Sequence, residues 1–337
     1  MITFFEIWIS IKYLLPKTKE KFFSLITLFS FLGISLGVAT LIIVMSVMNG
    51  FREELTSKIL GINGHLKIKS IYSSGLNEDE KFKKTLLNTN NQFLIHEIVS
   101  GHGLFTYKNY SNGILIKGVN TNYFKERKIF SKKLKESSLS SFDKEEGIFV
   151  GEKLKKKLNL NLGDYVSILS SKSYETFLGN FPRSANFKII GFFEVGMYEY
   201  DTSLVFMPMK MLQEFVNQSN KIDHYEVVVG VFDNLSQIKN SITLSIPKSM
   251  KVIDWRELNP SLFNAIEVER NVMFLILLLI IIVAAFNLIS SLMILVSTKK
   301  KDIGILRVLG ISNFQLLKIF MINGFLIGLL GTLLGLL

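Results

Sequence analysis

Three long apolar segments constrain this chain more than any other feature of its sequence. Two of them, 272–297 and 314–337, lie near the C-terminal end, and the third, 22–48, lies near the N-terminus. A helix of about 20 apolar residues crosses the roughly 30 Å hydrocarbon core of a bilayer. The sequence therefore predicts a membrane protein with α-helical transmembrane segments at both ends and a large insert between the first two.

Basic residues set the expected orientation of these segments. The link between the last two segments carries lysines at 299–301 and Arg307, and Lys17, Lys19 and Lys21 precede the first segment. Cytoplasmic loops are enriched in lysine and arginine, whereas long external loops cross the membrane largely regardless of charge. We therefore expect the N-terminus and the link in the cytoplasm, and residues 49 to about 270 outside.

The link has internal order of its own. Asp302 opens a run in which Ile303, Leu306 and Leu309 share one helical face, and Gly310 supplies a C-terminal stop. This spacing predicts a short amphipathic helix at the cytoplasmic membrane surface. An ordinary basic loop is the alternative on pattern alone.

Two helix starts can be read directly from the sequence. The segment 312–315 has the S-x-x-Q form of a capping box, and Asn259-Pro260 offers an N-cap followed by proline at the first helical position. A helix from 260 to 297 would be roughly 57 Å long, which exceeds the membrane core and predicts an external stalk. Asn287 inside it favours an interhelical hydrogen bond, with a substrate contact as the alternative.

Small residues mark one face of the first apolar segment. Gly33 and Gly37 form a G-x-x-x-G pair, a spacing that lets helices approach closely in lipid. Two interpretations fit the segment. One is plain helix packing, and the other is that the opposite or adjoining face, with Val44, Met48 and Phe51 near the outer end, lines a cavity for acyl chains.

The first 21 residues predict an interfacial helix on the cytoplasmic surface. Ile7, Ile11, Leu14 and Leu15 lie on one face of this aromatic-rich stretch, which ends in Pro16 and basic residues. A cleavable signal peptide is the rival interpretation. The long apolar run that follows lacks an A-x-A-like exit, which argues against it.

The insert predicts a mixed α/β domain, because short β-rich runs alternate with turn residues and amphipathic stretches. Expected strands span 65–69, 113–119, 147–150, 165–169, 187–193, 203–207 and 225–230. Expected helices span 80–87, 152–158, 209–216 and 235–242. The lysine- and serine-rich stretch from about 120 to 141 predicts a loosely packed surface segment.

The stretch 170–186 separates two expected strands and carries aromatic, proline and arginine residues, namely Phe177, Phe181, Pro182 and Arg183. A protruding element that contacts another protein and an ordinary long hairpin both fit this pattern.

Composition and motifs argue against several function classes. The chain has 337 residues, 48% of them hydrophobic, a net charge of +11, four histidines and no cysteine. The basic residues form no aromatic-interleaved stripe, so we expect no nucleic-acid binding. The sequence lacks a G-x-x-x-x-G-K-[ST] loop, and His96 and His102 are wrongly spaced for a helical zinc motif. We expect no bound cofactor, no metal site and no catalytic residues.

Three stretches in order resemble one transporter family. NVMFLILLLIIIVAAFNLISSLMILVSTKKKDIGILRVLGIS looks like the second transmembrane helix and coupling helix of the LolC/LolE permeases, the membrane subunits of the lipoprotein-releasing ABC transporter. SFLGISLGVATLIIVMSVMNGFREEL looks like their first transmembrane helix, and GFFEVGMYEYDTSLVFMP resembles part of their MacB-like periplasmic domain. The resemblance spans nearly the whole chain.

The resemblance implies a non-catalytic permease subunit in the bacterial inner membrane. Its implied partners are a LolD-like ATPase subunit that binds ATP, a second permease that is homologous or identical, lipoproteins, and a LolA-like periplasmic carrier. The implied sites are an ATPase-coupling set (Asp302, Ile303, Leu306, Arg307, Leu309), a lipoprotein cavity (Thr40, Val44, Met48, Phe51) and a carrier-binding hook (Phe177, Phe181, Pro182, Arg183). Gly33, Gly37 and Asn287 are expected to pack the helices.

The expected organisation has six parts: an interfacial helix 1–21, a first span 22–48, the periplasmic domain 49–259, a stalk and second span 260–297, a coupling helix 298–312 and a third span 313–337. The family pattern has a fourth span, which we expect to be absent here. LolC-like, LolE-like and merged forms all fit. An FtsX-like regulator of periplasmic hydrolases and a MacB-like exporter are the alternative functions.

Overall fold

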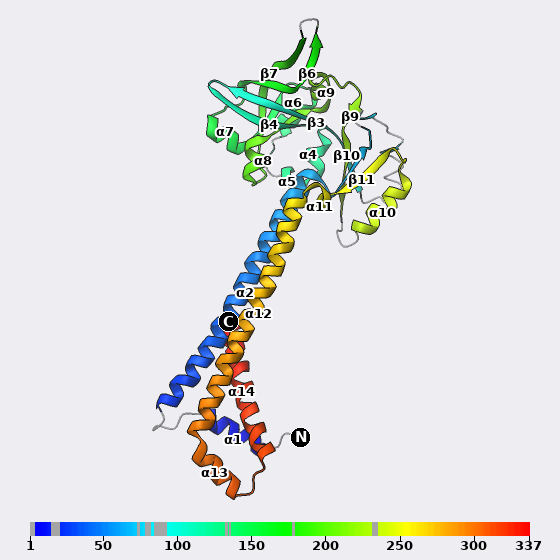
Figure 1. Cartoon of the computed structure of the whole chain (residues 1–337). Helices are drawn as coiled ribbons and strands as arrows, with labels where there is room; N and C mark the ends of the chain where they lie inside the picture. Colours follow the sequence, from blue (N-terminus) through cyan, green and yellow to red (C-terminus); the bar gives the residue numbers. More distant parts are fainter. Residues whose placement is uncertain are drawn as a thin grey trace. The chain divides into compact units, whose positions relative to one another are not determined.

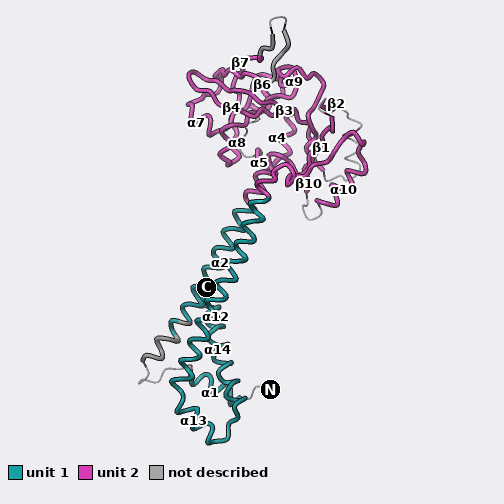
Figure 2. Tube along the Cα trace, in the orientation of Figure 1, with its two compact units in different colours: residues 1–52, 264–337 teal, residues 53–263 magenta. Residues whose placement is uncertain are grey.

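The computed structural model describes residues 4–14, 21–72, 75–77, 82–83, 93–131, 134, 136–176, 179–230 and 235–337. Contacts divide the chain into two compact units (Figure 2). Unit 1 comprises residues 1–52 and 264–337, and unit 2 comprises residues 53–263. Helices α2 (Lys21–Asn63) and α12 (Pro260–Thr298) each contribute residues to both units.

The described residues of unit 1 form helices joined by short turns. Unit 1 contains α1 (Phe4–Leu14), the first part of α2, most of α12, α13 (Lys300–Val308) and α14 (Asn313–Leu336) (Figure 1). Among the described residues, three helices are long and apolar enough to cross a membrane, Phe31–Asn63, Pro260–Thr298 and Asn313–Leu336. Most of the α12 side chains face outward, which suits a helix surrounded by lipid.

Both predicted helix starts are confirmed. Helix α12 begins at Pro260, and the carbonyl of Asn259 accepts the first helical hydrogen bond from Phe263 N at 3.0 Å. At the start of α14 the Ser312 hydroxyl accepts from Gln315 N at 3.3 Å, while the Gln315 side chain accepts from Ser312 N at 2.9 Å. These reciprocal bonds satisfy two of the donors that a helix N-terminus leaves open.

Several glycines lie where helices of unit 1 approach closely. A Cβ added to Gly33 would lie 3.2 Å from Asn287 Nδ2, and one added to Gly335 would lie 2.7 Å from the Ser35 carbonyl oxygen. The second distance is shorter than any real Cβ contact, so a larger residue there would push α14 away from α2. Small residues at helix crossings replace the hydrophobic drive that lipid cannot supply.

Unit 2 is built around a nine-stranded sheet of order β11-β1-β10-β3-β4-β8-β5-β7-β6. An additional pairing between β3 and β6 closes the strands from β3 to β6 into a ring. The bounds are β1 Leu66–Ser70, β3 Phe93–Tyr107, β4 Tyr110–Val119, β5 Ile148–Gly151, β6 Tyr165–Thr176, β7 Gly179–Phe193, β8 Leu204–Pro208, β10 His224–Val229 and β11 Met250–Asp254. A separate pair joins β2 (Leu76–Asn77) to β9 (Lys221–Ile222).

All seven expected strands are present, as β1, β4, β5, β6, β7, β8 and β10. The expected helices appear as α7 (Glu152–Leu158), α9 (Met209–Phe215) and α10 (Leu235–Ser245), whereas 80–87 lies largely outside the described residues. The remaining helices are α4 (Asn122–Glu126), α5 (Lys128–Ser131), α6 (Glu136–Asp143), α8 (Tyr198–Ser203) and α11 (Trp255–Leu258).

The prediction of a loose surface segment from about 120 to 141 is wrong. Helices α4 and α5 bury Tyr123, Phe124 and Phe130, each only 1% exposed. The ring of Phe124 meets that of Phe206 on β8 edge-to-face, with centroids 5.1 Å apart. The aromatic residues in this stretch form part of a second hydrophobic core, and its lysines and serines concealed that pattern.

Candidate functional site

Helix α13 lies in the basic link and ends as the sequence predicts. Gly310 adopts φ +92°, and its N–H donates to the Arg307 carbonyl at 3.0 Å, while Ile311 N donates to the Leu306 carbonyl at 3.1 Å. A left-handed residue just after a helix is usually glycine because it has no Cβ to clash. The turn that follows leads directly into the capping box of α14.

The exposed apolar face of α13 differs from the expected one. Ile303 and Leu306 are half-buried, whereas Ile305 (60% exposed), Val308 (89%) and Leu309 (73%) stand out from the protein. Sequence reasoning named Leu309 but missed Ile305 and Val308. Their spacings of three and four residues could have revealed a second face, since both faces of this helix are apolar.

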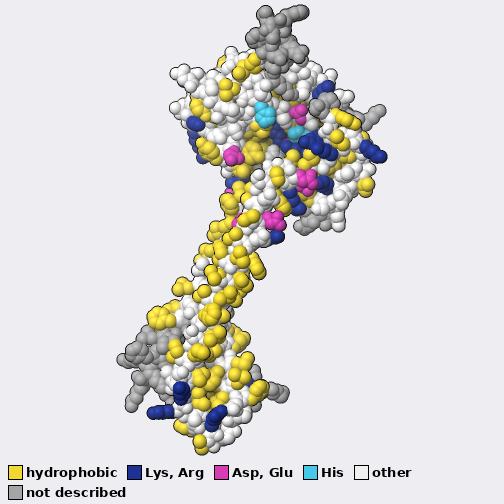
Figure 3. All heavy atoms as spheres, viewed as in Figure 1, with side chains coloured by type: hydrophobic (Ala, Val, Ile, Leu, Met, Phe, Trp, Pro, Cys, Tyr) yellow, Lys and Arg dark blue, Asp and Glu magenta, His cyan; other side chains and the backbone are white. Residues whose placement is uncertain are grey.

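Basic residues surround this exposed apolar face. Lys300, Lys301 and Arg307 are exposed, and Figure 3 shows lysine and arginine side chains gathered at the end of unit 1 where α13 lies. The Arg307 guanidinium donates to the Asn313 side-chain oxygen, which ties α13 to the first residue of α14. Asp302, in the first turn of α13, is half-buried.

The four expected cavity residues follow one side of α2. Thr40 and Phe51 are exposed, and Val44 and Met48 are half-buried. Next to Phe51, the Arg52 guanidinium lies 3.5 Å from the Glu269 carboxylate of α12. Farther along α12, a hollow of about 490 Å³ is lined by Ile289, Leu292, Met293, Val296 and Ser297.

The expected hook falls on a β-hairpin formed by β6 and β7, which continue through the stretch that was expected to separate two strands. Phe177 lies outside the described residues, as does the side chain of Phe181. Pro182 and Arg183 are exposed on β7, and Arg183 Nη1 donates to the Glu214 carbonyl at 2.6 Å. Arg183 therefore fastens the base of the hairpin to α9.

A buried ionic cluster holds the last turn of α2 inside unit 2. Glu226 on β10 is 0% exposed, and its two carboxylate oxygens each lie 2.7 Å from a cation, Lys117 on β4 and Arg127 after α4. Lys117 Nζ also donates to the Ile62 carbonyl at 2.7 Å, and Arg127 Nη1 donates to the Gly61 carbonyl at 3.0 Å. These carbonyls belong to the C-terminal end of a helix, where cations are favoured.

Protonation in this cluster is set by burial and by its charges. Burial alone would raise the pKa of Glu226, but Lys117 and Arg127 hold it well below its usual range. Burial lowers the pKa of Lys117 to about 7, although Glu226 opposes the shift. Burial, aided by Arg127, lowers the pKa of His96 to about 3 and that of His65 to about 4, so both imidazoles are neutral at pH 7.

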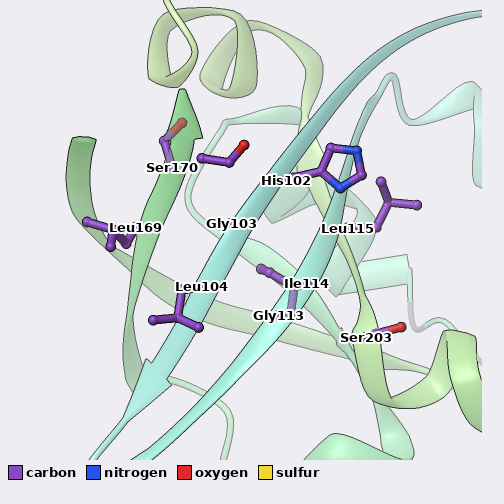
Figure 4. A pocket seen from close by; sticks show the side chains of 10 residues that line it. His102, Gly103, Leu104, Gly113, Ile114, Leu115, Leu169, Ser170 and Ser203 are labelled. Atoms are coloured by element: carbon purple, nitrogen blue, oxygen red, sulfur yellow. The ribbon is translucent and has the colours of Figure 1, made fainter. Parts of the chain in front are cut away.

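Neither the cluster nor the hollow beside β3 in unit 2 has the residues of a catalytic or metal site. In the described part of the chain, no three histidine or carboxylate side chains are grouped so that they could hold a metal ion. The hollow, of about 520 Å³, lies between β3, β4 and β6 and is lined mainly by leucines, serines and glycines with His102 at its edge (Figure 4). Its lining offers neither a carboxylate nor a nucleophile with a paired base.

Comparison with known proteins identifies the family. The MacB-like periplasmic core domain matches residues 27–244, and the FtsX-like permease C-terminal domain matches residues 274–337. The lipoprotein-releasing system transmembrane protein LolC of Neisseria meningitidis is 33% identical over 98% of this chain and 80% of its own length. The chain belongs to the LolC/LolE family. LolC of Xylella fastidiosa is 30% identical over 97% of this chain and 79% of its own length. LolE of Haemophilus influenzae is 27% identical over 97% of this chain and 80% of its own length.

Membership in the LolC/LolE family confirms the expected fold class and class of protein. The chain is an ABC transporter component of the inner membrane, and its MacB-like domain is periplasmic. This agrees with a chain that has apolar helices at both ends and a mixed α/β unit between them. The roles of single residues on α2, α13 and the β6–β7 hairpin stay predictions.

Proposed function

We propose that this chain is the permease subunit that extracts lipoproteins from the inner membrane and passes them to a periplasmic carrier. The observation that carries the proposal is the similarity to LolC over 98% of the chain, which includes both the apolar helices and the periplasmic unit. A separate ATPase subunit supplies the energy, as the resemblance to the LolC/LolE permeases implies. The chain transmits work and does not catalyse a reaction.

In this proposal α13 is the contact with the ATPase subunit. Its exposed residues Ile305, Val308 and Leu309 form an apolar face bordered by Arg307. Such a face on a cytoplasmic link fits a hydrophobic groove in a partner, with the basic residues at the rim. Ile303 and Leu306, which the sequence assigned to the same contact, are half-buried.

Helix α2 supplies the proposed lipoprotein contact, and a second permease completes the cavity. Thr40, Val44, Met48 and Phe51 lie at spacings of four and three residues, so they follow one face near the outer end of the span. Two of them are exposed, and a largely apolar face of this kind suits acyl chains. The β6–β7 hairpin is the proposed contact for a LolA-like carrier.

The test is a co-purification of the full chain in mild detergent. If the proposal is correct, an ATPase subunit and lipoproteins with intact acyl chains will co-purify, and ATP together with the carrier will discharge the lipoproteins. Recovery of the ATPase without lipoprotein would contradict lipoprotein release and favour an FtsX-like regulator or a MacB-like exporter. Val308→Glu is the matched variant, since it should lose the ATPase while the lipoprotein is retained.

A further inference from the structure

Helix α1 presents two different faces. Positions 6, 9, 10 and 13 recur at the spacing of a single helix face, and three of them, Glu6 (1% exposed), Ile9 (7%) and Ser10 (0%), are buried. The other side exposes apolar residues, namely Phe4, Phe5, Ile7, Trp8 and Ile11. An apolar face of this kind suits a helix lying in the membrane interface. The face that carries Glu6 is thus directed toward protein and not toward water.

This inner face contacts three successive residues near the start of α14. The Glu6 carboxylate lies 3.5 Å from Lys318 Nζ. The Ser10 hydroxyl donates to the Ile319 carbonyl at 3.0 Å, and the Tyr13 ring stacks on Phe320 with centroids 6.3 Å apart and planes inclined by 26°. An ion pair, a hydrogen bond and a ring contact therefore join α1 to α14 at three successive positions of α14.

Tyr13 also connects α1 to the beginning of α13. Lys299, the N-cap residue of α13, is 6% exposed, and its Nζ lies 5.9 Å from the centroid of the Tyr13 ring. Burial, with the nearby negative charge of Asp302, raises the pKa of the Tyr13 phenol. Tyr13 is thus close to the first turn of α13 and to α14 at once.

Helix α13 has little packing of its own to hold it in place. Within the fully described stretch 235–337, none of the nine residues of α13 is buried. A short helix draws most of its stability and its fixed orientation from packing. A push from an ATPase on such a helix would tilt it unless neighbouring residues held its ends.

We propose that α1 is a brace that fixes α13 against α14, and that Glu6 and Tyr13 are positioning residues for energy coupling. The inference rests on the proposed function, because it takes α13 as the contact with the ATPase subunit. The Arg307–Asn313 hydrogen bond holds the C-terminal end of α13, and Tyr13 with Lys299 holds its N-terminal end. Helices α1, α13 and α14 then move together as one rigid body when the ATPase subunit displaces α13.

A distance measurement tests the brace without reference to the cargo. The sequence has no cysteine, so Lys12→Cys and Lys301→Cys introduce two unique sites for spin labels on exposed residues of α1 and α13. In lipid nanodiscs, with the ATPase subunit bound, we expect one narrow distance distribution that is the same without nucleotide and with a non-hydrolysable ATP analogue. A distance that shifts between these two states would overturn the brace.

Charge reversal tests the contribution of Glu6. Glu6→Lys and Lys318→Glu should each lower the lipoprotein released per ATP hydrolysed by roughly tenfold, within the usual range of coupling between sites, and the double variant should recover much of it. Ile7→Ala on the exposed face is the matched control and should behave as the unmodified chain. Single reversals that release lipoprotein as the control does would overturn the role of Glu6.

Tyr13→Leu tests the brace in case the charge-reversal variants fail to assemble. It keeps an apolar side chain but removes the ring that contacts Phe320 and Lys299, and it should broaden the Lys12 to Lys301 label distance while the ATPase subunit still co-purifies. An unchanged narrow distance in this variant would contradict the brace. If the unmodified complex hydrolyses ATP at a fixed label distance but releases no lipoprotein, the proposed cargo is wrong and the brace stands.

Discussion

Two buried carboxylates, one in each unit, show how differently the units are held together. Glu226 in unit 2 is 0% exposed and meets two cations at 2.7 Å, and these cations also bind the last carbonyls of α2. Glu6 in unit 1 is 1% exposed, but Lys318 lies 3.5 Å away and keeps 23% of its side chain exposed. The first arrangement fixes a helix end within a folded domain. The second joins two helices whose own hydrogen bonds do not depend on it.

The largest expected effect comes from breaking the contact in unit 2. Glu226→Leu leaves Lys117 and Arg127 buried without their carboxylate, and we expect unit 2 to lose about 3 to 5 kcal/mol of unfolding free energy. Hydrogen exchange of the β3 and β10 amides in the detergent-solubilised chain measures this loss. Glu257→Ala is the control, because its ion pair with Lys239 is 53% exposed on the glutamate side and should contribute no more than about 1 kcal/mol. Equal losses of unfolding free energy in the two variants would mean that burial of Glu226 adds nothing to the strength of its ion pairs.

Lowering the pH should destabilise unit 2 more than unit 1, because all four histidines of the sequence lie in unit 2. Burial first, and Arg127 second, lower the folded-state pKa of His96 to about 3 and that of His65 to about 4, from 6.5. The unfolded chain therefore binds more protons below pH 6.5, and stability falls as the pH falls through that value. From pH 7 to 5.5 the two imidazoles together should cost unit 2 about 2.5 kcal/mol.

Amide exchange as a function of pH measures this loss of stability. His96→Asn should reduce the pH dependence, because the lowered pKa of His96 supplies part of it. The spin-label distance between α1 and α13 serves as the unit 1 reference and should not change over the same range. A parallel change in both units would indicate a general acid effect and not titration of the buried histidines.

The sequence predicted what depends on local patterns. Apolar length predicted three long apolar helices, Asn259-Pro260 and Ser312 to Gln315 predicted two helix starts, and alternation predicted seven strands. Each of these signals is contained in a few consecutive residues, so tertiary contacts are not needed to read it.

The sequence did not predict what depends on distant partners. Strand β3 (Phe93–Tyr107) was not predicted, because its burial pattern is not a simple alternation and its histidines and glycines suggest a polar stretch. The ionic cluster was not predicted, because Lys117 and Glu226 come together only when β4 and β10 lie on either side of β3. At the candidate site, the position of α13 was predictable, but which of its two apolar faces is exposed depends on its packing in unit 1.

Unit 1 should respond more to backbone spacing than to charge. Gly335→Ala would place a Cβ 2.7 Å from the Ser35 carbonyl oxygen, and we expect a loss of about 1 to 2 kcal/mol in the packing of α14 on α2. Unfolding in a denaturing detergent series measures it. Gly328 is the matched control on the same helix, since a Cβ there meets no described atom within 4 Å. Equal effects of the two alanines would mean that helix propensity, and not the close approach, decides the outcome.

The smallest expected effect on stability comes from the exposed face of α13. Val308 is 89% exposed, so Val308→Glu should change the unfolding free energy by less than about 0.5 kcal/mol. A carboxylate in an apolar contact must lose its hydration, and we therefore expect affinity for the ATPase subunit to fall by at least roughly tenfold. Leu306→Glu, at a half-buried position, should instead disturb the seating of α13 and change the Lys12 to Lys301 label distance. A change of that label distance in Val308→Glu as well would mean that the exposed side of α13 also holds the helix in place. The exposed side would then not serve the ATPase contact alone.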